Sequence, residues 1–318
     1  MGGFLDARVG MAVMTLAFAV ETHGGTPTSV GDPGWVDVTS YGARGDGVTD
    51  DTAAFRAAAE TGKNVRVPRP PAFYRISGTV RLHGSLQGDG TMPEIRMFGA
   101  DGTEAMSMLS VLDYEGPGLT ISGVQLDGQW DGVGTAGEWS HNILVKGSSN
   151  VTIEDNVLVR PYGDNILVGG ENNPKPSRNV VIRNNRLLDP RRCNVALISS
   201  REVLITQNVL RKMNDYVTAI DLEPNPTPDD AVWETRITEN AFESPRAVAV
   251  QLYHFDHGYP PDGLAGGDVS ITGNVGVWSR FFARVGNWAG VEESGNRRTR
   301  EPIPLGSGPW GPRPRDPR

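Results

Sequence analysis

The amino-acid sequence predicts an all-β solenoid, because one seven-residue phrase recurs along the chain. The phrase combines alternating apolar residues with a closing asparagine, and its copies are Asn150–Asn156, Asn179–Asn185, Glu202–Asn208, Glu234–Asn240 and Asp268–Asn274. Its central isoleucine, first seen at Ile153, returns after 29, 23, 32 and 34 residues, and Ile121 begins the same series 32 residues earlier. Repeats of this period are typical of solenoids. The 40 glycines and 23 prolines fit a fold with many turns.

Each phrase predicts a short β-strand whose apolar residues point inward. The closing asparagines are Asn156, Asn185, Asn208, Asn240 and Asn274. Asparagine tolerates the left-handed conformation of a sharp turn. Its amide can also donate and accept along a stack of amides about 4.8 Å apart. We therefore expect a buried structural ladder, with the variable gaps between phrases forming loops that carry binding.

The two ends of the chain differ from the repeats. In residues 1–34, Arg8 precedes an apolar run over residues 9–20, and Ala17-Phe18-Ala19 has the pattern of a signal cleavage site. The run is too short to span a bilayer. These features predict a signal peptide and a secreted or periplasmic protein, with a cytoplasmic protein as the alternative because Asp6 weakens the signal. Residues 294–318 are rich in Gly, Pro and Arg and predict a flexible tail, which leaves residues 35–293 as one domain.

Charge and cysteine content narrow the function classes. The formal net charge of -8 disfavours nucleic-acid binding. The single Cys193 cannot form an internal disulfide, so stability must come from the stacked core. The expected partner is a polysaccharide or oligosaccharide, with no nucleic acid and no membrane, and the expected state is a monomer.

A glycine-rich motif precedes the repeats. It runs from Tyr41 to Glu60, with Gly42, Gly45 and Gly47 allowing a tight turn and Asp50 placed to cap a helix. The helix is predicted from Asp51 to Thr61, with a small apolar stripe that suits the open end of a solenoid. The aspartates of this motif are predicted to be structural.

This motif, with Val65–Pro68, Tyr74–Ser77 and Leu86–Gly90, resembles the N-terminus of the pectate-lyase-like superfamily. That superfamily includes polygalacturonases, rhamnogalacturonases, pectate lyases, uronate epimerases and phage tailspikes. The resemblance covers roughly Trp35 to Gly286 and implies a single-stranded, right-handed parallel β-helix with an N-terminal capping helix. The motif specifies the fold and not the reaction. Where relatives usually carry a glycine, this chain has Pro68-Arg-Pro-Pro-Ala72, so the first turn is expected to be shaped differently.

Five further segments align as one strand from five successive coils, and they suggest where chemistry lies. They are Asn142–Lys146, Asn165–Gly169, Asn194–Ile198, Ala219–Glu223 and Ala249–Tyr253. The alternation of faces places Asp221 and Glu223 side by side on the outer face. Two residues along a strand are about 6.6 to 6.8 Å apart, near the lower limit of about 6.5 Å for the carboxylates of inverting glycoside hydrolases. We therefore predict Asp221 and Glu223 as catalytic residues.

Further candidates flank this pair. Asp164 is a third catalytic candidate or a turn residue. The predicted substrate-binding residues share a place near the same column of strands, and they are Arg191, Arg192, Tyr253, Gln251, Lys146 and His141. Trp130, Trp139 and Trp233 are candidate flat surfaces for sugar rings. Tyr253–His257 lacks a defined ligand spacing, so no metal site is predicted.

Three functions compete on these residues. The favoured one is acid/base hydrolysis of glycosidic bonds in a polysaccharide, which needs no cofactor. The second is a lyase or epimerase of uronate glycans, with Lys146, His141 or Tyr253 as the base. Arg191 or Arg192 would neutralise the uronate carboxylate, or Ca²⁺ would do so if the enzyme is a metal-dependent lyase. The third is a noncatalytic glycan-binding or tailspike-like module. The fold does not decide among them.

Overall fold

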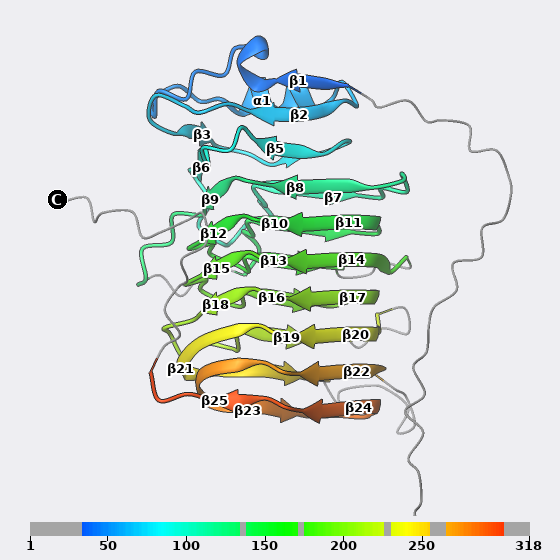
Figure 1. Cartoon of the computed structure of the whole chain (residues 1–318). Helices are drawn as coiled ribbons and strands as arrows, with labels where there is room; N and C mark the ends of the chain where they lie inside the picture. The colour runs from blue at the N-terminus through cyan, green and yellow to red at the C-terminus, as the bar shows by residue number, and fades with distance from the viewer. Residues whose placement is uncertain (1–33, 134–137, 171–174, 226–229, 255–264, 302–318) are drawn as a thin grey trace, which may run out of the picture. The chain divides into compact units, whose positions relative to one another are not determined.

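A computed structural model describes residues 34–133, 138–170, 175–225, 230–254 and 265–301 (Figure 1). The chain divides into two units, Met1–Asp32 and Pro33–Arg318, and the described residues all belong to the second. The predicted signal segment lies outside the described residues. No helix in the described parts is long and apolar enough to cross a lipid bilayer.

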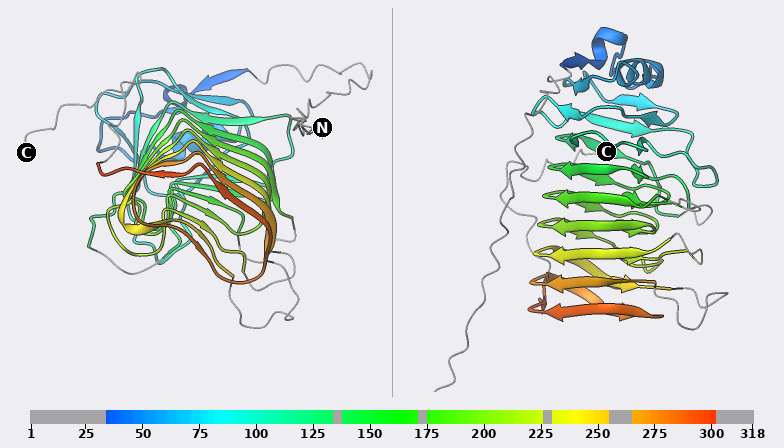
Figure 2. Two further views of the ribbon diagram at one scale, coloured as in Figure 1. Left: turned by 60° about the horizontal axis from the view of Figure 1, so that its bottom comes forward. Right: turned by 90° about the vertical axis from the view of Figure 1, so that its right-hand side faces the viewer.

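The second unit is a stack of parallel strands that form two sheets, and the stacking is visible from two further directions in Figure 2. Within the described residues, the first sheet consists of β1 (Trp35–Asp37), β2 (Asn64–Val67), β5 (Leu86–Gly88), β8 (Leu119–Ser122), β11 (Ser149–Glu154), β14 (Ser177–Arg183), β17 (Ser200–Thr206), β20 (Val232–Thr238), β22 (Gly266–Thr272) and β24 (Trp288–Ser294). Each strand is hydrogen-bonded to the strand one coil away, so the predicted parallel β-helix is confirmed.

The second sheet consists of two rows of strands that one long strand joins. One row is β3 (Tyr74–Ile76), β6 (Glu94–Met97), β9 (Gln125–Asp127), β12 (Val157–Val159), β15 (Arg186–Leu188) and β18 (Val209–Arg211). The other row is β4 (Val80–Arg81), β7 (Leu109–Leu112), β10 (Ile143–Lys146), β13 (Ile166–Val168), β16 (Val195–Leu197) and β19 (Ile220–Leu222). The joining strand β21 (Ala241–Leu252) pairs with both β18 and β19, and β23 (Val275–Arg284) and β25 (Arg297–Arg298) follow it. In the earlier coils the two rows are separate strands, whereas in the last coils one long strand runs through both rows.

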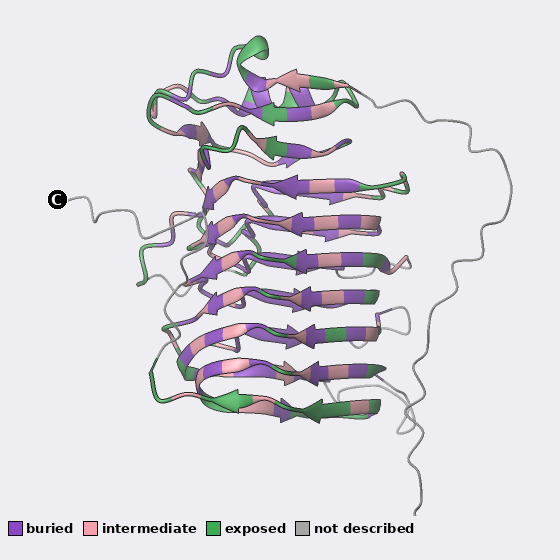
Figure 3. Cartoon of the chain, viewed as in Figure 1, coloured by how far each residue is buried: buried purple, intermediate pink, exposed green. Residues whose placement is uncertain are grey.

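The predicted register of the repeats is confirmed. The isoleucine of each phrase pairs with the isoleucine of the next, from Ile121 through Ile153 to Ile271, and all six side chains are fully buried. Figure 3 shows the resulting alternation of buried and less buried residues along the strands. Because strand residues alternate between faces, this column forms the inside of the coil.

The asparagine ladder is also confirmed. The Nδ2 of each asparagine donates to the Oδ1 of the next over 2.9 to 3.1 Å, and the same Oδ1 accepts the backbone N–H of the preceding asparagine. Each amide is thereby satisfied inside the fold, as buried polar groups require. The left-handed residues are the ones just before the ladder, including Asp155 at φ 55° and Asn184 at φ 54°. The expectation that the ladder asparagines themselves take the left-handed turn is therefore wrong.

The N-terminal motif forms a 3-10 turn (Val38–Tyr41) and the helix α1 (Thr52–Ala59), slightly shorter than predicted. Asp50 accepts the N–H of Thr52, and the buried Asp51 accepts the N–H groups of Arg44 and Gly45. These bonds confirm the structural role of the aspartates. The helix lies beside β1 and β2 at one end of the stack (Figure 1) and buries Phe55 in the main core. Its role as a cap stays a prediction.

The last coil extends beyond the predicted domain boundary. The strand β24 ends at Ser294, Asn296 joins the ladder by accepting from Asn274 at 2.9 Å, and β25 pairs with β23. Residues 294–298 therefore belong to the β-helix and not to a tail. The repeat was missed because Glu293 stands where the earlier phrases have isoleucine, as its pairing with Ile271 shows. Residues 302–318 lie outside the described residues.

Candidate active site

A hollow of about 410 Å³ lies on the outer face of the row that contains β13, β16 and β19. The described residues that line it come from these strands, from β21, and from the segments that precede or follow the strands of this row. They are Glu138, Trp139, His141, Leu167, Arg192, Ile198, Tyr216, Val217, Asp221, Glu223, Asn225, Gln251 and Tyr253. The predicted superposition of strands is confirmed, because Asp221 on β19 pairs with Ala196 on β16 and with Gln251 on β21.

Asp221 lies at the floor of the hollow. Its side chain points outward from β19 as predicted, but the surrounding turns leave the residue only 1% exposed. Its Oδ1 is buried and has no hydrogen-bond partner among the described residues. Burial, and then the nearby charge of Glu223, raise the pKa of Asp221 well above its ordinary value. A protonated carboxyl group is the form that this environment favours.

Glu223 follows β19 directly and is held from both ends. Its backbone N–H donates to the carbonyl of Leu197 at 2.9 Å, and its Oε1 lies 2.7 Å from Nη2 of Arg192. Burial raises the pKa of Glu223, and the guanidinium of Arg192 opposes that rise. Because Asp221 has no such cation within hydrogen-bond reach, Asp221 keeps the proton when the pair carries one charge.

Arg192 is the centre of an ion-pair network. Besides Glu223, its Nη1 lies 3.4 Å from Oδ2 of Asp164, and its Nε lies 3.6 Å from Oε2 of Glu138. These carboxylates raise the pKa of Arg192 although burial alone would lower it. The guanidinium therefore stays charged and is fixed in one orientation.

Asp164 does not line the hollow but lies fully buried behind it. Its Oδ1 accepts the N–H of Cys193 at 2.8 Å, and its Oδ2 lies 3.2 Å from Nδ1 of His141. Burial acts to raise the pKa of Asp164, but Arg192, His141 and the N–H of Cys193 together lower it below the ordinary value. Asp164 is therefore an ionised group that orients Arg192 and His141, and it does not itself reach the hollow.

A buried lysine supports the same turn from below. Lys212 is fully buried, and its Nζ donates to the carbonyls of Arg191 (3.2 Å) and Arg192 and to Oδ1 of Asn214 (2.7 Å). Burial lowers the pKa of Lys212 to about 8. These three acceptors anchor the backbone that presents Arg192. Sequence reasoning missed this residue, since an isolated lysine gives no sign that it will be buried.

Two predicted binding residues, Arg191 and Lys146, and two of the candidate tryptophans do not line the hollow. The guanidinium of Arg191 lies 4.7 Å from the ring centroid of Tyr216, and its Nη1 donates to the carbonyl of Tyr162, so it supports the hollow's wall without lining it. Lys146, on β10, and Trp233, on the first sheet, do not line the hollow either, and Trp130 is buried. Among the three tryptophans considered, only Trp139 reaches it.

The hollow also contains residues that sequence reasoning missed. Tyr216 and Val217 come from the turn before β19, and Glu138 and Asn225 come from turns on either side. Val217 has a φ of 60°, which is strained for a β-branched residue. Such strain persists where the surrounding structure imposes it, often at functional sites. Turn residues follow no repeat or alternation. Only their closeness in sequence to the strand of Asp221 could have indicated that they line the site.

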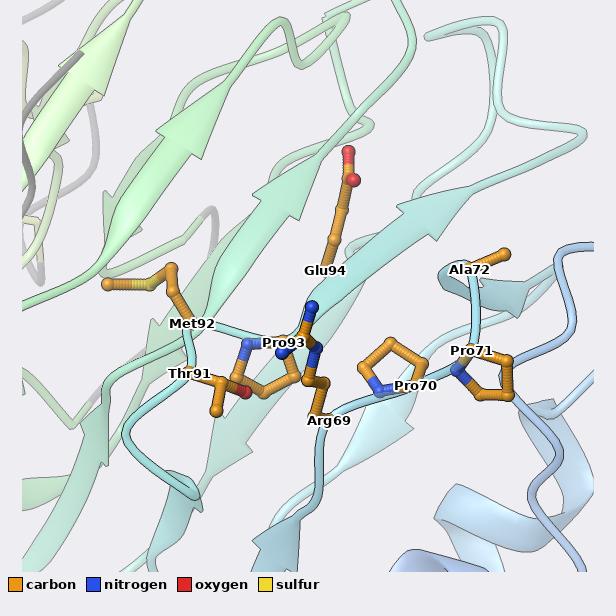
Figure 4. A pocket seen from close by; sticks show the side chains of 8 residues that line it. All are labelled: Arg69, Pro70, Pro71, Ala72, Thr91, Met92, Pro93 and Glu94. Atoms are coloured by element: carbon orange, nitrogen blue, oxygen red, sulfur yellow. The ribbon is translucent and has the colours of Figure 1, made fainter. Parts of the chain in front are cut away.

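Another hollow, of about 580 Å³, lies near the N-terminal coils (Figure 4). It is lined by Arg69, Pro70, Pro71, Ala72, Thr91, Met92, Pro93 and Glu94, and thus includes the proline-rich turn noted in the sequence. Glu94 is engaged by Nε of Arg96 and Nε2 of Gln125, both at 2.9 Å. Among the described residues that line this hollow, no second carboxyl group is present for acid/base work. No cluster of three or more His, Cys, Asp or Glu residues that could hold a metal occurs in the described parts of the chain.

Comparisons with known proteins agree with the fold. A family model described as rhamnogalacturonase A/epimerase, pectate lyase-like, matches residues 35–124. The preneck appendage protein of Bacillus phage PZA and the pre-neck appendage protein of Bacillus phage phi29 are each 30% identical over 169 residues, covering 47% of this chain and 20% of the relative. The match thus spans about a fifth of the length of these curated relatives.

Solved structures give the same result. The crystal structure of the N-terminal fragment of bacteriophage phi29 gene product 12 superimposes with a TM-score of 0.55 at 19% identity, covering 81% of this chain and 53% of that chain. At this identity the likeness concerns the fold alone. The chain is therefore similar to the pectate-lyase-like proteins over residues 35–124, and its stacked parallel sheets form a parallel β-helix.

Proposed function

We propose that the protein hydrolyses glycosidic bonds of a polysaccharide or oligosaccharide, with Asp221 as general acid and Glu223 as general base. The observation that carries the proposal is the buried, unpartnered Oδ1 of Asp221 in a hollow that also contains the Glu223–Arg192 ion pair. Two carboxyl groups whose environments separate their protonation states are what acid/base hydrolysis requires.

The proposed reaction uses each group once. The proton of Asp221 passes to the leaving glycosidic oxygen as the bond from the anomeric carbon breaks. A water molecule gives a proton to Glu223 and its hydroxyl to the anomeric carbon. Exchange with solvent then returns the proton from Glu223 to Asp221. Residues two positions apart along a strand have Cα atoms about 6.6 to 6.8 Å apart, and carboxyl groups held at such a separation would leave room for that water and give inversion at the anomeric carbon.

The charge arrangement favours hydrolysis over elimination. A lyase or epimerase needs a cation that is available to neutralise the uronate carboxylate and a base nearby. His141 and Tyr253, two of the candidate bases, do line the hollow, but Arg192, the one arginine or lysine among the described lining residues, already faces three carboxylates. Within the described residues, the hollow therefore offers little to an elimination mechanism.

A noncatalytic glycan-binding module remains the second candidate, because the curated relatives are phage appendage proteins. In either case, action outside a cell is part of the proposal. The aromatic side chains of Trp139, Tyr216 and Tyr253 in the hollow suit the flat faces of sugar rings.

The deciding experiment is incubation with a panel of polysaccharides, followed by mass spectrometry and ultraviolet absorbance of the products. Hydrolysis predicts fragments whose summed mass exceeds the substrate by one water per cleavage. Unsaturated, absorbing products would replace the proposal with a lyase. Binding without any product, in the wild type under conditions where the protein is folded, would support the binding module instead.

A further inference from the structure

We propose that the hollow at Asp221 selects a sugar unit that carries no acidic group. This inference rests on the proposed glycan function and adds the class of substrate. Uronates and sulfated sugars would be excluded by the charges that line the site, while neutral sugars would be accepted.

Acidic and basic groups are unequal in number in the hollow. The described lining residues include three carboxyl groups, those of Glu138, Asp221 and Glu223, and a single guanidinium, that of Arg192. His141 lies at the back beside Asp164 and pairs with that carboxylate when its ring is protonated. The hollow therefore holds more acidic than basic groups.

The guanidinium of Arg192 already faces carboxylates of the protein. Its side chain is 11% exposed and lies within 2.7 Å of Glu223, 3.4 Å of Asp164 and 3.6 Å of Glu138. Nη1 and Nη2 are hydrogen-bonded to Asp164 and Glu223, and Nε, which has no hydrogen-bond partner among the described residues, is buried, so an incoming carboxylate would have to displace one of these side chains to reach the guanidinium. Bidentate binding of an acidic sugar needs a guanidinium edge that is open to the ligand. In this hollow the carboxylates of the protein already lie against the guanidinium.

Glu138 adds an exposed carboxylate to the hollow. Its side chain is 48% exposed at the mouth of the hollow, next to Trp139, which is 40% exposed. A negatively charged sugar stacked on Trp139 would lie beside this carboxylate and be repelled by it. A neutral sugar would meet no such repulsion.

The remaining lining groups suit uncharged sugars. The ring of Tyr216 is 44% exposed, and with Trp139 it offers apolar faces to the C–H groups of a sugar ring. The amide group of Gln251 can donate to and accept from hydroxyl groups. Amides carry no charge, so they add recognition without favouring an anion.

The test compares polysaccharides that differ only in their carboxyl groups. Polygalacturonate, alginate and hyaluronan are each immobilised in native form and after carboxyl reduction, together with neutral galactan and dextran. The probe is the Asp221→Asn protein, because the amide has the shape of a protonated carboxyl group and should bind without turnover. We expect at least one reduced or neutral polymer to bind at least about tenfold more tightly than any native acidic polymer.

Each outcome decides one of the two claims. Tighter binding to a native uronate polymer than to its reduced form would overturn the selection and leave the glycan site standing. Absence of binding to every polymer, by both the variant and the wild type, would overturn the glycan function and the selection together.

A matched pair of variants tests the charge argument itself. Glu138→Gln removes one carboxylate from Arg192, and we expect it to reduce the discrimination against acidic polymers by about fivefold or more. Glu154→Gln removes a carboxylate from a comparable arginine pair on β11, where Arg183 lies 2.6 Å away, and should leave the discrimination unchanged. Equal behaviour of the two variants would show that Glu138 does not set the selection.

Discussion

Nη2 of Arg192 lies 2.7 Å from Oε1 of Glu223, whereas Asp221, two residues earlier on the chain, has a buried Oδ1 without a partner. One guanidinium thus distinguishes two carboxyl groups that would otherwise be similar. The group with the cation is suited to act as a base, and the group without it is suited to hold a proton.

Replacing either carboxyl group by its amide should remove turnover of the identified glycan. Asp221→Asn and Glu223→Gln should each lower kcat by about a hundredfold or more, the usual contribution of a positioned acid or base. The control is Glu202→Gln, an exposed carboxylate on the first sheet. The wild type should show a bell-shaped dependence of kcat/KM on pH. Near-full activity of either amide variant would refute the two-carboxylate mechanism.

The stability of the protein should depend on pH through Asp221. Burial raises its pKa above the ordinary 3.8, so the folded state binds this proton more tightly than the unfolded chain does. The stabilisation is complete below the unfolded pKa and is lost as pH rises through the folded pKa. Asp221→Asn carries no such proton. The thermal midpoint of Asp221→Asn, minus that of the wild type, should therefore increase as pH rises from about 4 to about 9. A constant difference between the two midpoints across that range would contradict the raised pKa.

Asp164 should act as a positioning residue. Asp164→Asn removes the charge behind Arg192 and His141, so we expect kcat to fall by about tenfold or more and the limbs of the pH profile to move. Asp189→Asn is the matched control, since Asp189 pairs with Arg211 away from the hollow. The variant's activity is compared with the fraction of protein that is folded. If the two fall by the same factor and the pH profile of activity is unchanged, Asp164 has a purely structural role.

The buried asparagine ladder should be costly to interrupt. Asn208→Ala removes donors to the carbonyls of Ile182 and Thr206 and an acceptor for Asn185, which leaves several buried groups unpaired. At roughly 1 to 3 kcal/mol for an unsatisfied group, we expect a loss on the order of 3 kcal/mol in the free energy of unfolding.

The control for the ladder is Asn179→Ala, whose amide bonds to Asn150 at 2.8 Å in an exposed position. It should cost about 1 kcal/mol or less. Equilibrium unfolding in urea compares the two variants. Similar losses would mean that burial of the amide stack does not stabilise the coil.

The coiled architecture could be predicted because it depends on local alternation that repeats. Ile153 and Asn156 mark one coil, and the same spacing marks the next, so the register of the strands followed from the sequence. The last coil was missed because Glu293 replaces the expected isoleucine. Charged residues are tolerated there because Glu293 is exposed at the end of the stack.

The site could be predicted only in part. Strand alternation placed Asp221 and Glu223 on the outer face, and both line the hollow. It could not show that turns cover Asp221, that Asp164 is buried behind Arg192, or that Arg191 contacts Tyr216. Those features depend on how three turns from different coils pack together, and turns have no periodicity from which packing can be inferred.

Direct observation of the proton on Asp221 tests the central claim without knowledge of the substrate. Carboxyl carbons of aspartate are labelled with a heavy isotope, and their chemical shifts are followed by nuclear magnetic resonance from about pH 3 to about pH 9, a range that spans the ordinary aspartate pKa of about 3.9. The account predicts one aspartate that titrates far above the others and whose signal is absent in Asp221→Asn. If every aspartate of the folded wild type has lost its proton below about pH 5, Asp221 is not an acid at neutral pH and the proposed mechanism is contradicted.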